Sequence, residues 1–148
     1  MIRESFRCVI DASAGIKLFT EEDYTAEIIK LFEQLNHNSP YSIFVPDIYF
    51  AECANIFWKL VRRGAYPADL GEINLARIKA LDLPTTPTSV LMERAFQIAL
   101  EFGISAYAAC YVALAERLEL PLLTADARLA QVVPQYAVTI ESAKLRWM

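Results

Sequence analysis

The chain has 148 residues, of which 55% are hydrophobic and 22% charged, with only four glycines and a formal net charge of −4. This composition is typical of a compact globular protein and excludes a disordered or repeat-built chain. The negative net charge argues against a protein that holds nucleic acid through general positive charge. Any role with nucleic acid therefore needs local basic groups or a bound cation.

Length and local composition predict one domain over residues 1–148, in the cytoplasm and not in a membrane, because no apolar run nears the ~20 residues that span a bilayer. The cysteines lie among apolar residues without metal-ligand spacing, which predicts reduced core residues: Cys8, Cys53 and Cys110. The sole histidine, His37, lies in a turn-forming cluster, where we expect a solvated loop. A sole histidine in such a loop argues against a Ser-His-Asp triad, and one histidine cannot form a two-histidine metal site.

Short apolar runs alternate with helical patterns along the chain. Strands are expected at about residues 7–10, 42–45, 122–124 and 138–140. Helices are expected from a capping box at Thr20 and Asp23, over about 48–63, from 67 to 81, over about 91–102, and after Ser105, where Tyr107, Tyr111, Leu114 and Leu118 form the apolar stripe. Residues 83–88 are linker-like but too short to separate domains. This alternation predicts an α/β fold with a parallel sheet covered by helices on both faces.

Acidic residues follow two of the predicted strands directly. Asp11 follows the first strand, and Asp126 follows the run that ends at Ala125. Ligands bind at the carboxyl ends of the strands in an open parallel sheet, so these two side chains are expected to meet there. A third acid, Glu52, lies in the early turns of the helix after the second strand, near the same edge.

These three acids have both a structural and a chemical interpretation. Asp11 and Asp126 each stand where they could cap a following helix. Three clustered carboxylates would repel one another by roughly 4 kcal/mol per pair at 4 Å with an effective dielectric of 20, which favours a hard cation such as Mg²⁺ or Mn²⁺ among them. On the helix of Glu52, a polar stripe continues through Asn55, Lys59, Arg62 and Arg63. It is either a solvated face or a surface for a partner or RNA.

Four segments in this order resemble the motifs of the PIN domain, in particular the VapC-type toxins of bacterial and archaeal toxin–antitoxin pairs. They are Val9–Ser13, Pro46–Asp47 with Glu52–Asn55, Ile104–Tyr107 with Tyr111–Glu116, and Leu122–Leu129. The resemblance covers essentially the whole chain. It implies a three-layer α/β/α sandwich with a mostly parallel central sheet and a Mg²⁺- or Mn²⁺-dependent endoribonuclease that cuts RNA. It also implies a cognate antitoxin protein that blocks the site, and a homodimer.

Position by position, the resemblance assigns catalysis and metal binding to Asp11, Glu52 and Asp126, with polar support from Ser13, Asn55 and Thr124. Each supporting residue could equally satisfy local backbone groups. A fourth family acid is missing, because this chain has Ala108 where the family usually has aspartate.

Ala108 leaves three interpretations open. It is an engineered substitution that disarms a toxin, or natural decay that leaves a fold able to bind without cutting, or a site where three acids suffice for weak activity.

Two rival classes also place aspartates after parallel strands. A receiver domain would have an acidic neighbour beside Asp11, and a haloacid-dehalogenase-like phosphotransferase would have a second aspartate where Ser13 stands. The remaining alternative is a binding module on the PIN fold without catalysis.

Overall fold

The computed structural model of the chain describes residues 6–36 and 42–148, so the turn predicted around His37 lies outside the described residues. Five parallel strands form one sheet in the order β3-β2-β1-β4-β5. The strands are β1 (Cys8–Ile10), β2 (Ile43–Pro46), β3 (Thr85–Thr86), β4 (Leu122–Thr124) and β5 (Ala137–Thr139). The predicted parallel sheet is confirmed, and in the described residues it has no antiparallel strand.

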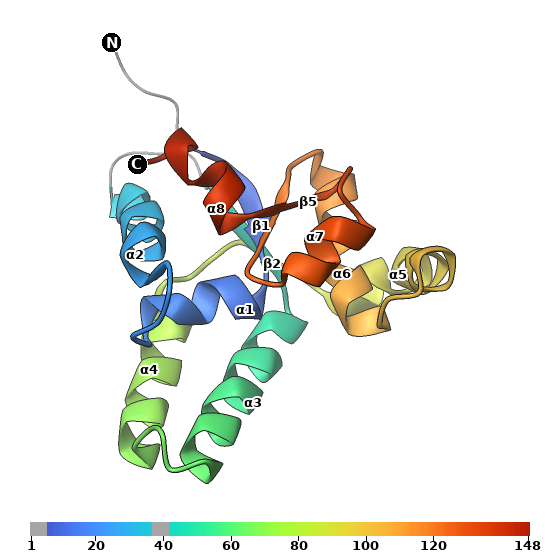
Figure 1. Cartoon of the computed structure of the whole chain (residues 1–148). Coiled ribbons are helices and arrows are strands. Elements are labelled where there is room, and N and C mark those ends of the chain that lie inside the picture. Colours follow the sequence, from blue (N-terminus) through green and yellow to red (C-terminus); the bar gives the residue numbers. More distant parts are fainter. Residues whose placement is uncertain (1–5, 37–41) are drawn as a thin grey trace.

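Helices fill the connections between the strands. The α-helices are α1 (Ala12–Gly15), α2 (Thr25–Glu33), α3 (Ile48–Arg62), α4 (Ala68–Ala80), α5 (Thr88–Phe102), α6 (Ala106–Leu118), α7 (Ala127–Val132) and α8 (Ile140–Ala143). Three 3₁₀ turns, η1 (Ile16–Leu18), η2 (Gln34–Asn36) and η3 (Lys144–Arg146), extend α1, α2 and α8. Figure 1 shows α2 and α4 to one side of the strands and α5 and α6 to the other, which is the expected three-layer α/β/α arrangement.

The hydrophobic core is built around the central strand of the sheet. All three residues of β1 are buried, because β1 lies in the middle of the sheet and helices cover both of its faces. Helix α6 packs against β1 and β2, and every residue from Ala109 to Ala115 is buried. The three cysteines are buried and free, as predicted: Cys8, Cys53 and Cys110.

No single helix in residues 6–36 and 42–148 is long and apolar enough to cross a membrane. Helices α5 and α6 reach that length and composition only as a pair, with a bend of 112° between them.

Three local predictions were wrong. The linker-like segment contains the edge strand β3, where Thr85 pairs with Val45 of β2. Helix α2 begins at Thr25 without a side-chain cap, because Tyr24 adopts a left-handed conformation and the Thr20 hydroxyl donates to the Ile16 carbonyl instead. Tyr107, predicted to lie on the apolar stripe of α6, is 64% exposed.

The carboxyl ends of β1, β2 and β4 lie together at one edge of the sheet. The register pairs Ile10 of β1 with Leu123 of β4, and the Asp11 amide donates to the Leu123 carbonyl at 3.2 Å. Helices α1, α3 and α7 begin just after these three strands. Side chains from separate parts of the chain therefore meet at this edge.

Candidate metal centre

Asp11 is the buried acid at the centre of this edge. Its carboxylate caps α1 by accepting from the Ala14 amide at 3.0 Å. It also accepts from the Ser13 hydroxyl at 2.6 Å and from the Thr124 hydroxyl at 2.5 Å. Burial raises the pKa of Asp11 to about 6, although the three hydrogen bonds favour the charged form, and the nearby charge of Glu52 raises the pKa further.

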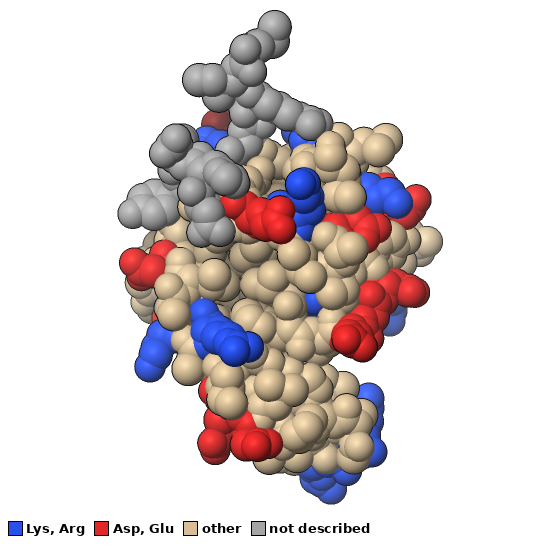
Figure 2. Space-filling model, turned by 90° about the vertical axis from the view of Figure 1, so that its left-hand side faces the viewer, with Lys and Arg blue, Asp and Glu red and all other residues tan. Residues whose placement is uncertain are grey.

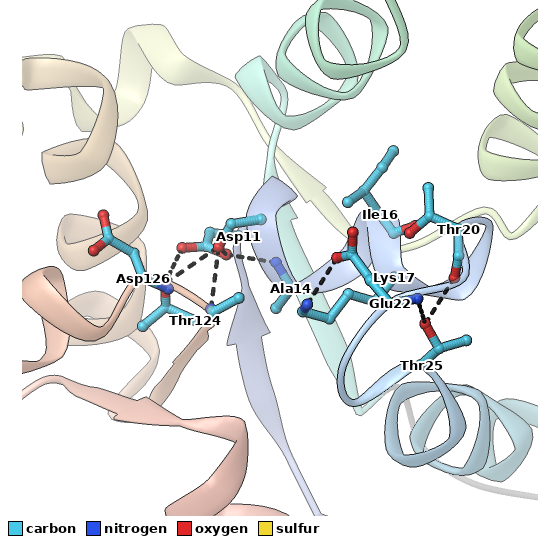
Figure 3. Close-up of polar contacts among 11 residues, drawn as sticks. Asp11, Ala14, Ile16, Lys17, Thr20, Glu22, Thr25, Thr124 and Asp126 are labelled. Atoms are coloured by element: carbon cyan, nitrogen blue, oxygen red, sulfur yellow. Dashed lines mark hydrogen bonds and ion pairs between the residues drawn. The ribbon is translucent and has the colours of Figure 1, made fainter. Parts of the chain in front are cut away.

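Ser13 and Thr124 connect β1 to β4 around that carboxylate. The Ser13 hydroxyl accepts from the Ala125 amide at 3.1 Å, and the Thr124 hydroxyl accepts from the Asp126 amide at 3.0 Å. Their two oxygens lie 3.4 Å apart. The two hydroxyls thus hold the Asp11 side chain and the loop after β4 in one network, part of which Figure 3 shows.

Asp126 contributes an exposed carboxylate to the same edge. It caps α7, where its side chain accepts from the Leu129 amide at 3.1 Å. In Figure 3 the carboxylate of Asp126 points away from that of Asp11. The structural interpretation of both aspartates as helix caps is therefore confirmed, and capping leaves the second oxygen of Asp126 free to face a ligand.

Glu52 enters the site from the second turn of α3. It accepts a 2.5 Å hydrogen bond from the hydroxyl of Tyr111, whose side chain is buried. Burial, followed by the charge of Glu52, raises the pKa of Tyr111, so the phenol stays protonated and donates. From the sequence, Tyr111 was expected on an apolar helix stripe and within a PIN-like motif, but with no role in the site. Its spacing of three residues from Ala108 on one helix would have shown that both face the same cavity.

One pocket of about 260 Å³ brings together the three acids, Ser13, Asn55, Lys59 and Ala108. Thr124 is buried and does not line it, and neither do Arg62 and Arg63 of the polar stripe. The lining of the pocket is Asp11, Ala12, Ser13, Glu52, Asn55, Ile56, Lys59, Ser105, Ala108, Tyr111, Asp126 and Leu129. Asn55 is exposed at the rim, and within the described residues no hydrogen bond joins it to Glu52. Ser105, which was expected only as a cap, does cap α6 through the Ala108 amide at 3.1 Å and also lines the pocket.

The donor set of this pocket suits a hard divalent cation in chemistry, since every candidate ligand is a carboxylate or hydroxyl oxygen. As the side chains stand, no three acids, histidines or cysteines of the described residues are close enough to hold an ion. Glu52 is turned to Tyr111 and Asp126 to the start of α7. A shared ion therefore requires these two side chains to rotate toward Asp11.

Comparisons with known proteins agree with this architecture. The sequence pattern of the PIN domain family matches residues 8–133. The chain is 32% identical over 132 residues to Ribonuclease VapC3 of Pyrobaculum aerophilum, covering 86% of this chain and 95% of that protein. It is 33% identical over 122 residues to Ribonuclease VapC9 of Mycobacterium tuberculosis, covering 82% of this chain and 87% of that protein.

Two solved structures share the fold. The crystal structure of PAE2754 from Pyrobaculum aerophilum superposes with a TM-score of 0.75 at 21% identity, covering 97% of this chain and 90% of that one. A toxin–antitoxin complex from Klebsiella pneumoniae contains a chain with a TM-score of 0.61 at 17% identity, covering 89% of this chain and 96% of that one. By its matched domain and its VapC relatives, the chain belongs to the PIN domain family, among its VapC-type members.

Proposed function

We propose that this chain is a metal-dependent endoribonuclease and the toxin of a toxin–antitoxin pair. The observation that carries the proposal is the pocket at the carboxyl edge of the sheet, which Asp11, Glu52 and Asp126 line together from three separate segments. The names of the VapC relatives, which are ribonucleases, support the reaction class. Phosphotransfer on an aspartate has no comparable support, because Asp11 lacks the acidic partner which those classes need.

The proposed metal ligands are Asp11, Glu52 and Asp126, and the proposed ion is Mg²⁺ or Mn²⁺. When bound, such an ion lowers the pKa of a water molecule and neutralises charge on the phosphodiester under attack. Ser13 and Thr124 fix the orientation of the Asp11 carboxylate, so its oxygens are held in place before the substrate arrives. The hydroxyl of Tyr111 holds Glu52 at the wall of the pocket, and Glu52 would leave this hydrogen bond to reach an ion shared with Asp11.

Ala108 presents a methyl group to this pocket. The resemblance to the family implies that a carboxylate usually stands at this position. A Mg²⁺ site built from few carboxylates takes its other ligands from water and from the substrate phosphate. The loss of one charged ligand should therefore weaken metal binding without unfolding the protein. We expect the chain to be weakly active or inactive as it stands.

The proposed partners are an RNA substrate, a cognate antitoxin whose segment covers the pocket, and a second copy of the chain. The antitoxin is supported by the Klebsiella pneumoniae complex, which contains a chain of the same fold. The proposed location is the cytoplasm, where RNA is available as substrate.

The experiment that tests this function is an RNA cleavage assay on the original chain and on Ala108→Asp, with Mg²⁺ or Mn²⁺ and with a chelator. The new carboxylate adds a charged ligand in the pocket, so metal-dependent cleavage should rise at least about tenfold. Removing even an outer partner of a metal site lowers activity by about this factor, so restoring a direct ligand should raise it by no less. Ala106→Asp is the matched control. It places an acid in the same first turn of α6, but position 106 does not line the pocket.

Cleavage that rises in Ala108→Asp but not in Ala106→Asp supports the proposal. Equal activity in the original chain and in Ala108→Asp would show that position 108 does not face the metal. No cleavage by any of the proteins, despite metal bound to Ala108→Asp, would instead assign the chain to the class of PIN-fold binding modules.

A further inference from the structure

A second hollow continues the acidic pocket along the protein surface. It has a volume of about 250 Å³ and lies between the end of α5 and the start of α7. Four residues line both cavities: Ser105, Ala108, Asp126 and Leu129. Because the two share this wall, they form one groove, with Asp11 and Glu52 in the acidic pocket and Asp126 on the shared wall.

Each half of this groove has one basic side chain. Lys59 of α3 lines the acidic pocket, and Arg128 of α7 lines the second hollow. Both side chains are exposed, and within the described residues neither forms an ion pair or a hydrogen bond. Elsewhere, Lys17, Lys30, Arg94 and Lys144 are paired with glutamates. Each hollow therefore has one cation available to a ligand, and Asp126 lies on the wall between the two hollows.

Their placement matters because the protein as a whole does not attract polyanions through its net charge. The net charge is −4. Figure 2 shows the face that lies on the left-hand side of Figure 1. Acidic and basic side chains are mixed on this face, and they form no continuous basic surface there. An RNA strand gains most of its affinity from contacts between cations and phosphates. Within the described residues, the groove combines a continuous hollow with two cations that form no ion pair.

We infer that Lys59 and Arg128 bind the phosphates on either side of the one that is cut, so that the RNA strand runs from α3 across the acids to α7. This inference rests on the proposed ribonuclease function and adds the path of the substrate and the residues that hold it. Phosphate contacts of this kind fix the register of a strand and carry no sequence information. They place one phosphodiester over Asp11 for any base sequence.

The test measures the affinity of the protein for a single-stranded RNA oligonucleotide by fluorescence anisotropy over a range of salt concentrations. Magnesium is held at one low value, and gels confirm that the RNA stays intact. The variants are Lys59→Gln and Arg128→Gln, singly and together. The matched controls are Lys79→Gln at the end of α4 and Arg117→Gln at the end of α6, which remove the same charges outside the groove.

Each groove variant should lower the slope of log affinity against log salt by about 0.7, the value for one phosphate contact on a single strand. The ratio of the affinity of the original protein to that of the variant should thus fall about fivefold when the salt concentration rises tenfold. The double variant should lose about twice the slope, and the controls should keep it. Circular dichroism confirms that all variants are folded.

RNA binding that keeps the original slope in Lys59→Gln and Arg128→Gln would overturn this inference and leave the ribonuclease proposal standing. An equal loss of slope in the two controls would also overturn it, because the groove would then be no different from the rest of the surface. A lack of RNA binding by every protein, the original included, would overturn the proposed function itself.

Discussion

Asp11→Asn should stabilise the folded protein when no metal is present. The buried carboxylate has a pKa of about 6, raised from its ordinary value of 3.8 mainly by burial. At about 1.36 kcal/mol per pKa unit, this difference corresponds to about 3 kcal/mol of stability that is present below pH 3.8 and lost as the pH rises through about 6. Asparagine cannot ionise, so the variant does not lose this stability as the pH rises.

The hydrogen bonds around position 11 permit this substitution. The asparagine oxygen can still accept from the Ser13 hydroxyl and the Ala14 amide, as Oδ1 of Asp11 does. The asparagine NH₂ group would face Thr124, whose hydroxyl oxygen can accept a hydrogen bond when its proton turns away. We therefore expect the free energy of unfolding at mildly alkaline pH to rise by up to about 3 kcal/mol.

The assay is urea unfolding followed by circular dichroism as a function of pH, in chelator and in Mg²⁺. In chelator, Asp11→Asn should be the more stable protein above pH 6 and should show a flatter pH dependence between 3.8 and 6. Added Mg²⁺ should stabilise the original chain more than the variant, because a ligand stabilises only the state that binds it. The reasoning is refuted if the variant is the less stable protein in chelator at mildly alkaline pH.

Asp47→Asn is a matched control with the opposite sign. The exposed Asp47 accepts hydrogen bonds from the amide and hydroxyl of Thr88 at the start of α5, and these bonds lower its pKa. A lowered pKa means that its stabilisation is present above the unfolded-state value and is lost as the pH falls. Asp47→Asn should therefore destabilise the protein at neutral pH.

Other outcomes follow from the core. Burial raises the pKa of Cys53 to about 12, so the buried thiols should react with Ellman's reagent only as the protein unfolds, and fast labelling of the native protein would contradict this. Gly15→Ala should cost about 1–3 kcal/mol in urea unfolding, because its Cβ would overlap the Tyr49 hydroxyl. Gly71→Ala within α4 should instead gain about 0.5–1 kcal/mol, since the new Cβ would lie 3.7 Å from Phe57 of α3, an ordinary contact distance; a loss would show that the site is tighter than described.

The sequence predicts the central part of the fold well because its strands are short apolar runs buried on both faces. Strands β1, β2 and β4 lie within one or two residues of their expected positions. Edge strand β3 has only two residues, Thr85 and Thr86, between prolines, so no hydrophobic pattern indicates it. The start of α2 depends on the left-handed conformation of Tyr24, which the capping-box pattern did not reveal. That residues 1–148 act as one domain remains a prediction.

The candidate site, too, could be predicted from the sequence only in part. Positions at strand ends indicate which residues meet, and Asp11, Glu52 and Asp126 do line one pocket. The directions of their side chains depend on neighbours that sequence spacing does not identify, such as Tyr111 for Glu52. Whether these acids bind metal and cut RNA stays a prediction.

Manganese binding to the crystalline protein tests the central claim most directly, since Mn²⁺ can replace Mg²⁺ at oxygen sites and scatters anomalously. Crystals of the original chain and of Ala108→Asp, grown with Mn²⁺, should show an anomalous peak in the pocket within about 2.0–2.6 Å of a carboxylate oxygen of Asp11. Glu52 and Asp126 should have turned toward the ion, and occupancy should be higher in Ala108→Asp. Manganese bound only elsewhere on the protein, in both crystals, would contradict the account.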